Sequence, residues 1–110
     1  MYLPPLKGLE PADQVQLAGR NFGPLSTMII ANLFTRFRPN VADFQIDRNP
    51  ILREGAIVVG EMLRANDDIK SLDVRFCALG PGGASGLADA LRHNTSVERV
   101  LALANDVRTM

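Results

Sequence analysis

The chain has 110 residues, of which 46% are hydrophobic, and its 12 basic residues balance its 12 acidic ones. This composition is typical of one domain with a continuous core, and it argues against a broad basic surface for nucleic acid or membranes. No apolar run approaches the roughly 20 residues that a membrane-spanning helix needs, and the start MYLPPLKGLEP lacks the apolar stretch of a secretory signal. A single cysteine excludes an internal disulfide, so we expect an intracellular, cytoplasmic protein.

The sequence is organised as a repeat. Residues 41–68 align with residues 69–96 over 28 positions without a gap, and the apolar positions of the first segment recur in the second. The matched pairs are Val41 with Ile69, Phe44 with Leu72, Ile46 with Val74, Ile51 with Leu79, Val59 with Leu87 and Leu63 with Leu91. A repeat of this length predicts a solenoid.

Two further units flank this pair. Ala12, Val15, Leu17 and Phe22 begin a first unit, and Val97, Val100, Ala102, Asn105 and Val107 form the strand half of a fourth. We therefore divide the chain into an N-terminal extension or cap at residues 1–11 and a repeat domain at residues 12–110. The repeats run over about 12–40, 41–68, 69–96 and, in part, 97–110.

Each unit reads L-x-x-L-x-L-x-x-N-x-L, with Asn49 and Cys77 in the ninth place, followed by G-A-x-x-L-A-x-x-L. This pattern resembles the leucine-rich repeat family, in particular its ribonuclease-inhibitor-like class with repeats of about 28–29 residues. The first unit departs from it, because Arg20 stands where Asn is expected and the Asn follows at position 21. The resemblance covers about residues 12–107 and implies an α/β solenoid of about 3.5 repeats. In such a right-handed superhelix, helices line a short parallel sheet.

The residues of one unit predict the same architecture. Alternation sends Phe44 and Ile46 to one face of a short strand and Gln45 and Asp47 to the other. After the turn, apolar residues recur at steps of three and four, as in an amphipathic helix: Ala56, Val59, Gly60 and Leu63. We further expect the small residues Ala31, Gly60 and Ala88 to bring each helix close to the sheet. Asn66 and Asn94 are expected to cap helices in the left-handed conformation.

Several motifs that could carry chemistry are better explained by the repeat. The segment Gly80–Gly86 follows a strand and opens a helix, but its spacing matches no phosphate-binding loop, and Gly83 repeats Gly55. His93 has no Cys or His at ligand spacing, and Cys77 fits a packed position in the repeat. We therefore expect no cofactor, no metal and no enzymatic activity.

The remaining candidate for function is the outward face of the strands, where we predict a protein-binding surface. It comprises Gln45, Asp47, Arg48, Asp73, Arg75, Phe76, Arg99, Leu101 and Leu103. An apolar cluster at its C-terminal edge is typical of a contact surface. A slip of one residue in the fourth strand would instead turn Leu101 and Leu103 inward and Val100 and Ala102 outward. Both registers are open from the sequence.

A second apolar region lies on the helices, where Met28-Ile29 and Ile57-Val58 occupy corresponding places. It is either a convex binding stripe or an ordinary flank between neighbouring helices, and we favour the flank.

The expected partner is another protein, or a second copy of the chain that pairs with the edge of the fourth strand. Neither nucleic acid binding nor membrane insertion is expected. We interpret the chain as a non-catalytic interaction module within a larger assembly or a longer array. An alternative, by family analogy alone, is a regulator of a small GTPase or of actin filament ends, because Ran GTPase activators and tropomodulin-like cappers carry similar repeats.

Overall fold

The computed structural model describes residues 14–37, 41–102, 104 and 105. The strands are β1 (Gln14–Gln16), β2 (Asp43–Gln45), β3 (Ser71–Asp73) and β4 (Arg99–Leu101), and the helices are α1 (Pro24–Phe37), α2 (Leu52–Arg64) and α3 (Gly80–Arg92). The predicted extension at residues 1–11, and with it Ala12, Leu103 and Val107, lies outside the described residues.

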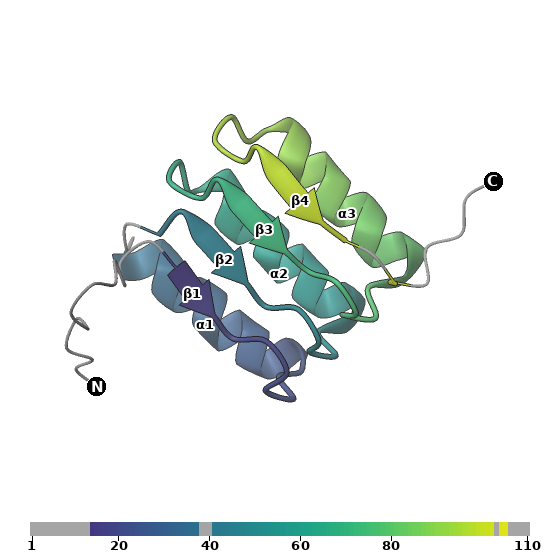
Figure 1. Cartoon of the computed structure of the whole chain (residues 1–110). Coiled ribbons are helices and arrows are strands. Elements are labelled where there is room, and N and C mark those ends of the chain that lie inside the picture. The colour runs from purple at the N-terminus through teal and green to yellow at the C-terminus, as the bar shows by residue number, and fades with distance from the viewer. Residues whose placement is uncertain (1–13, 38–40, 103, 106–110) are drawn as a thin grey trace.

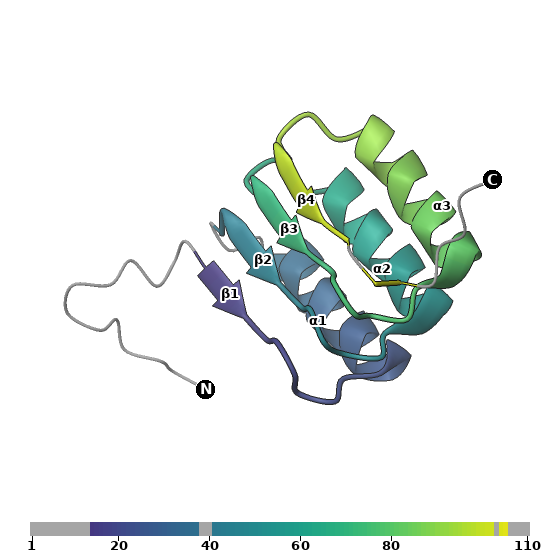
Figure 2. The ribbon, with the colours of Figure 1, turned by 45° about the vertical axis from the view of Figure 1, so that its right-hand side comes forward.

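The four strands form one parallel sheet in the order β1-β2-β3-β4. Strands and helices alternate along the chain, and the helices lie side by side in a second layer behind the sheet (Figure 1). Figure 2 shows the two layers from the side, with one face of the sheet turned away from the helices. We call this face the outer sheet face. The predicted α/β architecture of repeated strand-helix units is confirmed.

The core lies between the two layers, where the predicted inward residues meet. Phe44 and Leu72 are partners in the register of neighbouring strands and are 1% and 0% exposed. The helices contribute Val59, Leu63 and Leu87 to the same cluster. Burial of this continuous apolar surface is the main term that stabilises the stack, since one unit alone has no partner for its inner face.

The register of the fourth strand is now decided. Val100 pairs with Leu72 in the inward row, and Leu101 pairs with Asp73 on the outer sheet face. Asn105 confirms this register, because its side-chain oxygen accepts hydrogen bonds from the backbone N–H groups of Cys77 at 2.8 Å and Leu79 at 3.2 Å. A slip of one residue would remove Asn105 from that position and leave both donors without this acceptor.

Asn49 serves the first unit in the same way. Its side-chain oxygen accepts from the N–H groups of Arg20 and Phe22, at 2.8 and 2.9 Å. Its amide nitrogen donates to the carbonyl groups of Leu17, at 2.7 Å, and Ile46, at 2.9 Å. Each buried Asn therefore satisfies backbone groups of its own unit and of the preceding unit.

The prediction of left-handed helix caps at Asn66 and Asn94 is wrong. The residues with positive φ do not include either asparagine, and the caps at Ala65 and His93 have φ of −100° and −102°. The asparagines instead use their side chains, and the oxygen of Asn94 accepts from the N–H groups of Ser96 and Val97. Asn is favoured here because its side chain imitates a backbone turn.

The expected role of the small helix residues also needs correction. A Cβ atom added to Gly60 would lie 3.0 Å from the Cβ atom of Ala90, so Gly60 brings α2 close to α3 and not to the sheet. Ala88, its counterpart one unit later, is exposed.

Candidate functional site

The register places the predicted binding residues together on the outer sheet face. Gln45, Asp73 and Leu101 form one row across β2, β3 and β4, and Ser71 separates Asp43 from Arg99 in the row beside it. Leu103, the last residue of the prediction, lies outside the described part of the chain.

Two carboxylates of this group are buried beneath arginines. Asp47 and Asp73 are 3% and 5% exposed, although Asp73 occupies an outward position of β3 and Asp47 an outward position just after β2. Arg75 donates two hydrogen bonds to the Asp73 carboxylate, from Nε at 3.0 Å and from Nη2 at 2.7 Å. The hydrogen bond that Arg75 donates to Asp73 is the main reason that the pKa of Arg75 is raised. This geometry fixes the planar guanidinium on the sheet.

Arg48 is held in a similar way and also contacts an aromatic ring. Its Nη1 donates to Oδ2 of Asp47 at 2.7 Å, and its guanidinium lies 5.1 Å from the ring centre of Phe76. The second carboxylate oxygen of Asp47, Oδ1, is buried and accepts no hydrogen bond from any residue that the structure describes. A cation over an aromatic face is attractive, so the two side chains of neighbouring units support each other.

Both residues of this Arg48–Phe76 stack adopt the left-handed backbone conformation, with φ of 60° and 57°. The corresponding residues in the outer units are Gly19 and Ala104, with φ of 64° and 61°. The turn thus requires positive φ in all four units, although only Gly19 adopts it without a steric penalty. A non-glycine residue in such a conformation costs on the order of 1–3 kcal/mol, and such strain gathers at functional sites.

A polar hollow of about 230 Å³ lies next to the stack on the outer sheet face. It is lined by Asp43, Gln45, Ser71, Asp73, Arg75, Arg99 and Leu101. Arg48 and Arg75 have carboxylate partners, whereas Arg99 forms no ion pair with any described residue and is exposed. Beside two guanidinium groups whose positions are already fixed, the described part of this surface therefore also presents the exposed Arg99 cation.

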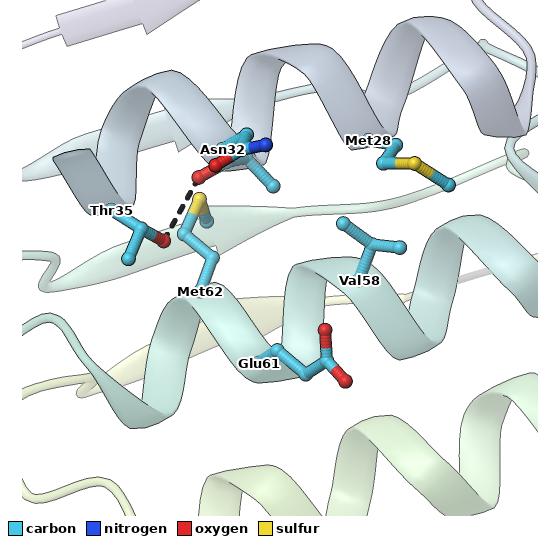
Figure 3. Close-up of a pocket in the computed structure, with 7 residues that line it drawn as sticks. Met28, Asn32, Thr35, Val58, Glu61 and Met62 are labelled. Carbon is cyan, nitrogen blue, oxygen red and sulfur yellow. Dashed lines mark hydrogen bonds between the residues drawn. The ribbon is translucent and has the colours of Figure 1, made fainter.

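The predicted apolar stripe on the helices divides into two parts. Met28 and Val58 line a groove of about 370 Å³ between α1 and α2, together with Ala31, Asn32, Thr35, Glu61 and Met62 (Figure 3). Ile57 approaches α3, since its Cγ1 lies 3.9 Å from where a Cβ atom on Gly86 would be. These residues act as flanks between helices, although Met28 and Ile57 remain 48% and 41% exposed.

Sequence reasoning missed Leu25 and Leu33 on α1, which are 69% and 49% exposed. Together with Ile29 they recur every four residues, so they lie on one side of the helix. The helical spacing of the three residues is a signal that would have found them.

The residues considered for other chemistry have structural explanations. Cys77 is 0% exposed, and burial raises the pKa of its thiol to about 11, which suppresses thiolate chemistry. A Cβ atom on Gly83 would lie 3.1 Å from Cα of Arg53 and 3.2 Å from Cβ of Ala56, so that glycine permits close helix packing. Among the described residues, no group of three His, Cys, Asp or Glu side chains is placed to hold a metal ion.

Comparison with known protein families and with curated protein sequences finds no match. Within the described ranges, no helix is both long enough and apolar enough to cross a membrane.

Proposed function

We propose that this chain is a leucine-rich-repeat module of the ribonuclease-inhibitor-like class, which binds another protein through its outer sheet face and performs no catalysis itself. The support for this assignment is the repeat of about 28 residues together with the parallel strand-helix units and the buried Asn49 and Asn105 between them. The proposal includes an intracellular setting, because a lone Cys77 cannot form an internal disulfide.

The observation that carries the binding proposal is the Arg48–Phe76 stack. Arginine and large aromatic residues dominate binding energy at protein interfaces, particularly where their side chains are already ordered. Arg48 is fixed by Asp47 and by the Phe76 ring, while the ring itself is 47% exposed. A partner that covers this stack therefore orders few additional side chains and loses little entropy on binding.

The polar hollow beside the stack suggests what the partner presents. Arg99 forms no ion pair with any described residue, and Leu101 adds a half-buried apolar contact. A partner with an aromatic or aliphatic side chain over Phe76 and a carboxylate near Arg99 complements both features.

The test uses glycine substitutions at positions whose backbone already has positive φ. Arg48→Gly and Phe76→Gly remove the stack and relieve backbone strain. Arg48→Gly also removes the side chain that covers Asp47, which opens that carboxylate to water, and circular dichroism checks that both variants fold. Ala78→Gly is the matched control, because Ala78 also has positive φ, at 55°, and is exposed but lies outside the stack. Affinity capture followed by mass spectrometry is expected to identify proteins retained by the parent and by Ala78→Gly but lost from both stack variants. Identical sets of captured proteins from all four chains would contradict the proposal.

The proposal also includes association through the free edge of β4, with another protein or with a second copy. Within the described residues β4 pairs only with β3, so its other edge presents unpaired backbone groups. Leu101→Glu places a charge at this edge, and together with Leu103→Glu it is expected to weaken association while the circular dichroism spectrum stays unchanged. Sedimentation velocity measures the effect, and a parent that is monomeric at high concentration and indistinguishable from the double variant would argue against edge pairing.

A further inference from the structure

The polar hollow on the outer sheet face has charges of opposite sign on its two sides. Asp43 on β2 and Arg99 on β4 stand at the two ends of one register row, and Ser71 on β3 lies between them. Neither charge belongs to an ion pair among the described residues. The hollow is therefore negative over β2 and positive over β4.

The charged residues between these two sides compensate each other. Asp73 and Arg75 also line the hollow, and they pair through two hydrogen bonds, so together they add no net charge. Lys70 and Glu98 precede Ser71 and Arg99 in the sequence but do not line the hollow. The difference in charge between the two sides is thus not cancelled by other groups of the hollow.

Both unpaired charges can be reached by a partner. Arg99 is exposed, and Asp43 is half-buried. Oδ2 of Asp43 accepts a hydrogen bond from Nε2 of Gln45 at 2.8 Å, which holds the carboxylate in place, and no other described residue donates to this carboxylate. Asp43 can therefore accept a further hydrogen bond from a cationic group without losing the bond to Gln45.

The spacing of the two charges indicates the shape of the partner. Neighbouring strands of a sheet lie about 4.8 Å apart, so the Cα atoms of Asp43 and Arg99, two strands apart, are separated by roughly 10 Å. Positions i and i+7 of an α-helix lie on one face and about 10.5 Å apart, since the helix rises about 1.5 Å per residue. Positions on one face of an extended chain lie about 7 Å or about 13 Å apart, which fits less well.

The backbone of the sheet also favours a helix as the partner. β3 pairs with β2 on one side and with β4 on the other, so its backbone groups are not free to bind an extended chain that lies across the sheet. Extended partners gain much of their affinity from such main-chain hydrogen bonds. A helix pairs its own backbone groups and needs only side-chain contacts, and the small side chain of Ser71 leaves room for it in the middle of the row.

We propose that the hollow receives a helix of a partner protein, which lies across the strands of the outer sheet face. The inference rests on the proposed function, and it names the element of the partner that this face recognises. The helix presents an acidic residue to Arg99 and, seven positions away, a basic residue to Asp43. A small residue between them lies over Ser71, and an apolar residue beside the acidic one contacts Leu101, which also lines the hollow.

The probe is a phage-displayed library in which positions i, i+3, i+4 and i+7 on the exposed face of one helix are randomised in a stable three-helix bundle. A bundle is needed because a short isolated helix is only marginally stable in water. Selection on the parent chain is expected to enrich binders with one acidic and one basic residue at i and i+7. A library of linear peptides is expected to yield no binder that depends on Asp43 and Arg99.

Charge reversals make the test specific. Arg99→Glu makes both sides of the hollow acidic and is expected to weaken a selected binder at least about fivefold, whereas Lys in place of the acidic residue of the binder restores the affinity. Asp43→Lys makes both sides basic, so there the affinity returns with Glu in place of the basic residue. Glu61→Lys, at an exposed position of α2, changes the net charge as much as Asp43→Lys does and is expected to leave every binder unaffected.

The proposal is overturned if the helical library yields no binder that both reversals weaken, or if the binders that they weaken lack a charge pair with seven-residue spacing. Phe76→Gly separates this outcome from a failure of the proposed function. Binders that Phe76→Gly weakens and the reversals do not would refute the helix in the hollow but keep the outer sheet face as a binding surface. Binders that none of these outer-face variants affects would count against both proposals.

Discussion

The turns that follow β1 and β3 differ from the turn that follows β2 in the side chain that the next unit supplies. Asn49 and Asn105 each accept two backbone N–H groups of the preceding turn. For the turn that follows β2, the equivalent residue of the next unit is Cys77. Its Sγ donates to the carbonyl groups of Ile46, at 3.3 Å, and Arg75, at 3.5 Å.

A thiol is a weak hydrogen-bond acceptor. In the turn after β2, a backbone carbonyl group of the turn itself therefore accepts the N–H group that binds an asparagine side chain in the other two turns. The N–H group of Ile51 donates to the carbonyl oxygen of Asn49 at 2.7 Å, whereas the equivalent N–H groups of Phe22 and Leu79 donate to an asparagine side chain. The comparison shows that the fold accepts two different ways of pairing this N–H group. Four predictions test this view.

The largest effect is expected for Cys77→Arg. The thiol is fully buried, so a guanidinium there exceeds the volume of the site and brings a charge into the core, and the nearby carboxylates of Asp47 and Asp73 already pair with Arg48 and Arg75. An uncompensated buried charge costs more than about 4 kcal/mol, which is a large part of the stability of a small domain. Circular dichroism on urea titration is expected to show an unfolded or strongly destabilised chain, and a native-like midpoint would show that the site tolerates charge.

Asn49→Leu is expected to lower the free energy of unfolding by roughly 3 kcal/mol. It leaves the N–H groups of Arg20 and Phe22 without their acceptor, and each buried unpaired group costs about 1–3 kcal/mol. Urea denaturation measures the change, with Asn105→Leu as the comparison in the fourth unit. A loss below about 1 kcal/mol would show that water replaces the side chain.

Stability is expected to fall at alkaline pH because of Cys77. Burial raises the pKa of its thiol from the ordinary value of 9.0 to about 11. Above pH 9 the unfolded chain therefore loses a proton that the folded chain retains, and this contribution to stability, complete below pH 9, is lost as pH rises toward 11. The difference in unfolding free energy between the parent and Cys77→Ser is expected to change by on the order of 2–3 kcal/mol between pH 8 and pH 11. A constant difference would contradict the buried, protonated thiol.

Cys77→Asn is expected to have the smallest effect, a change below about 1 kcal/mol. The position matches Asn49 and Asn105, so its amide nitrogen has the carbonyl groups of Ile46 and Arg75 to donate to. Denaturant melting checks this, and a loss above about 2 kcal/mol would show that the turn after β2 has become specific for cysteine.

Most of the fold follows from the 28-residue period, because the period specifies which residues are neighbours. It placed Gln45 beside Asp73 and Arg48 beside Phe76 in advance. Burial of Asp47 and Asp73 did not follow, because alternation predicts the direction of a side chain and not which arginine covers it. The caps at Asn66 and Asn94 failed for a related reason, since Asn stabilises a turn either through positive φ or through its side chain.

The hydrogen bonds of Asn49 and Asn105 to the preceding units have a consequence for folding kinetics. They join residues 26 to 32 positions apart, so each one closes a chain loop of nearly the same length. Loop-closure entropy depends only weakly on length, and it is therefore nearly constant from one unit to the next. Once two units have docked, each further unit adds by the same elementary step, so folding is expected to spread along the stack like a zipper from any starting pair.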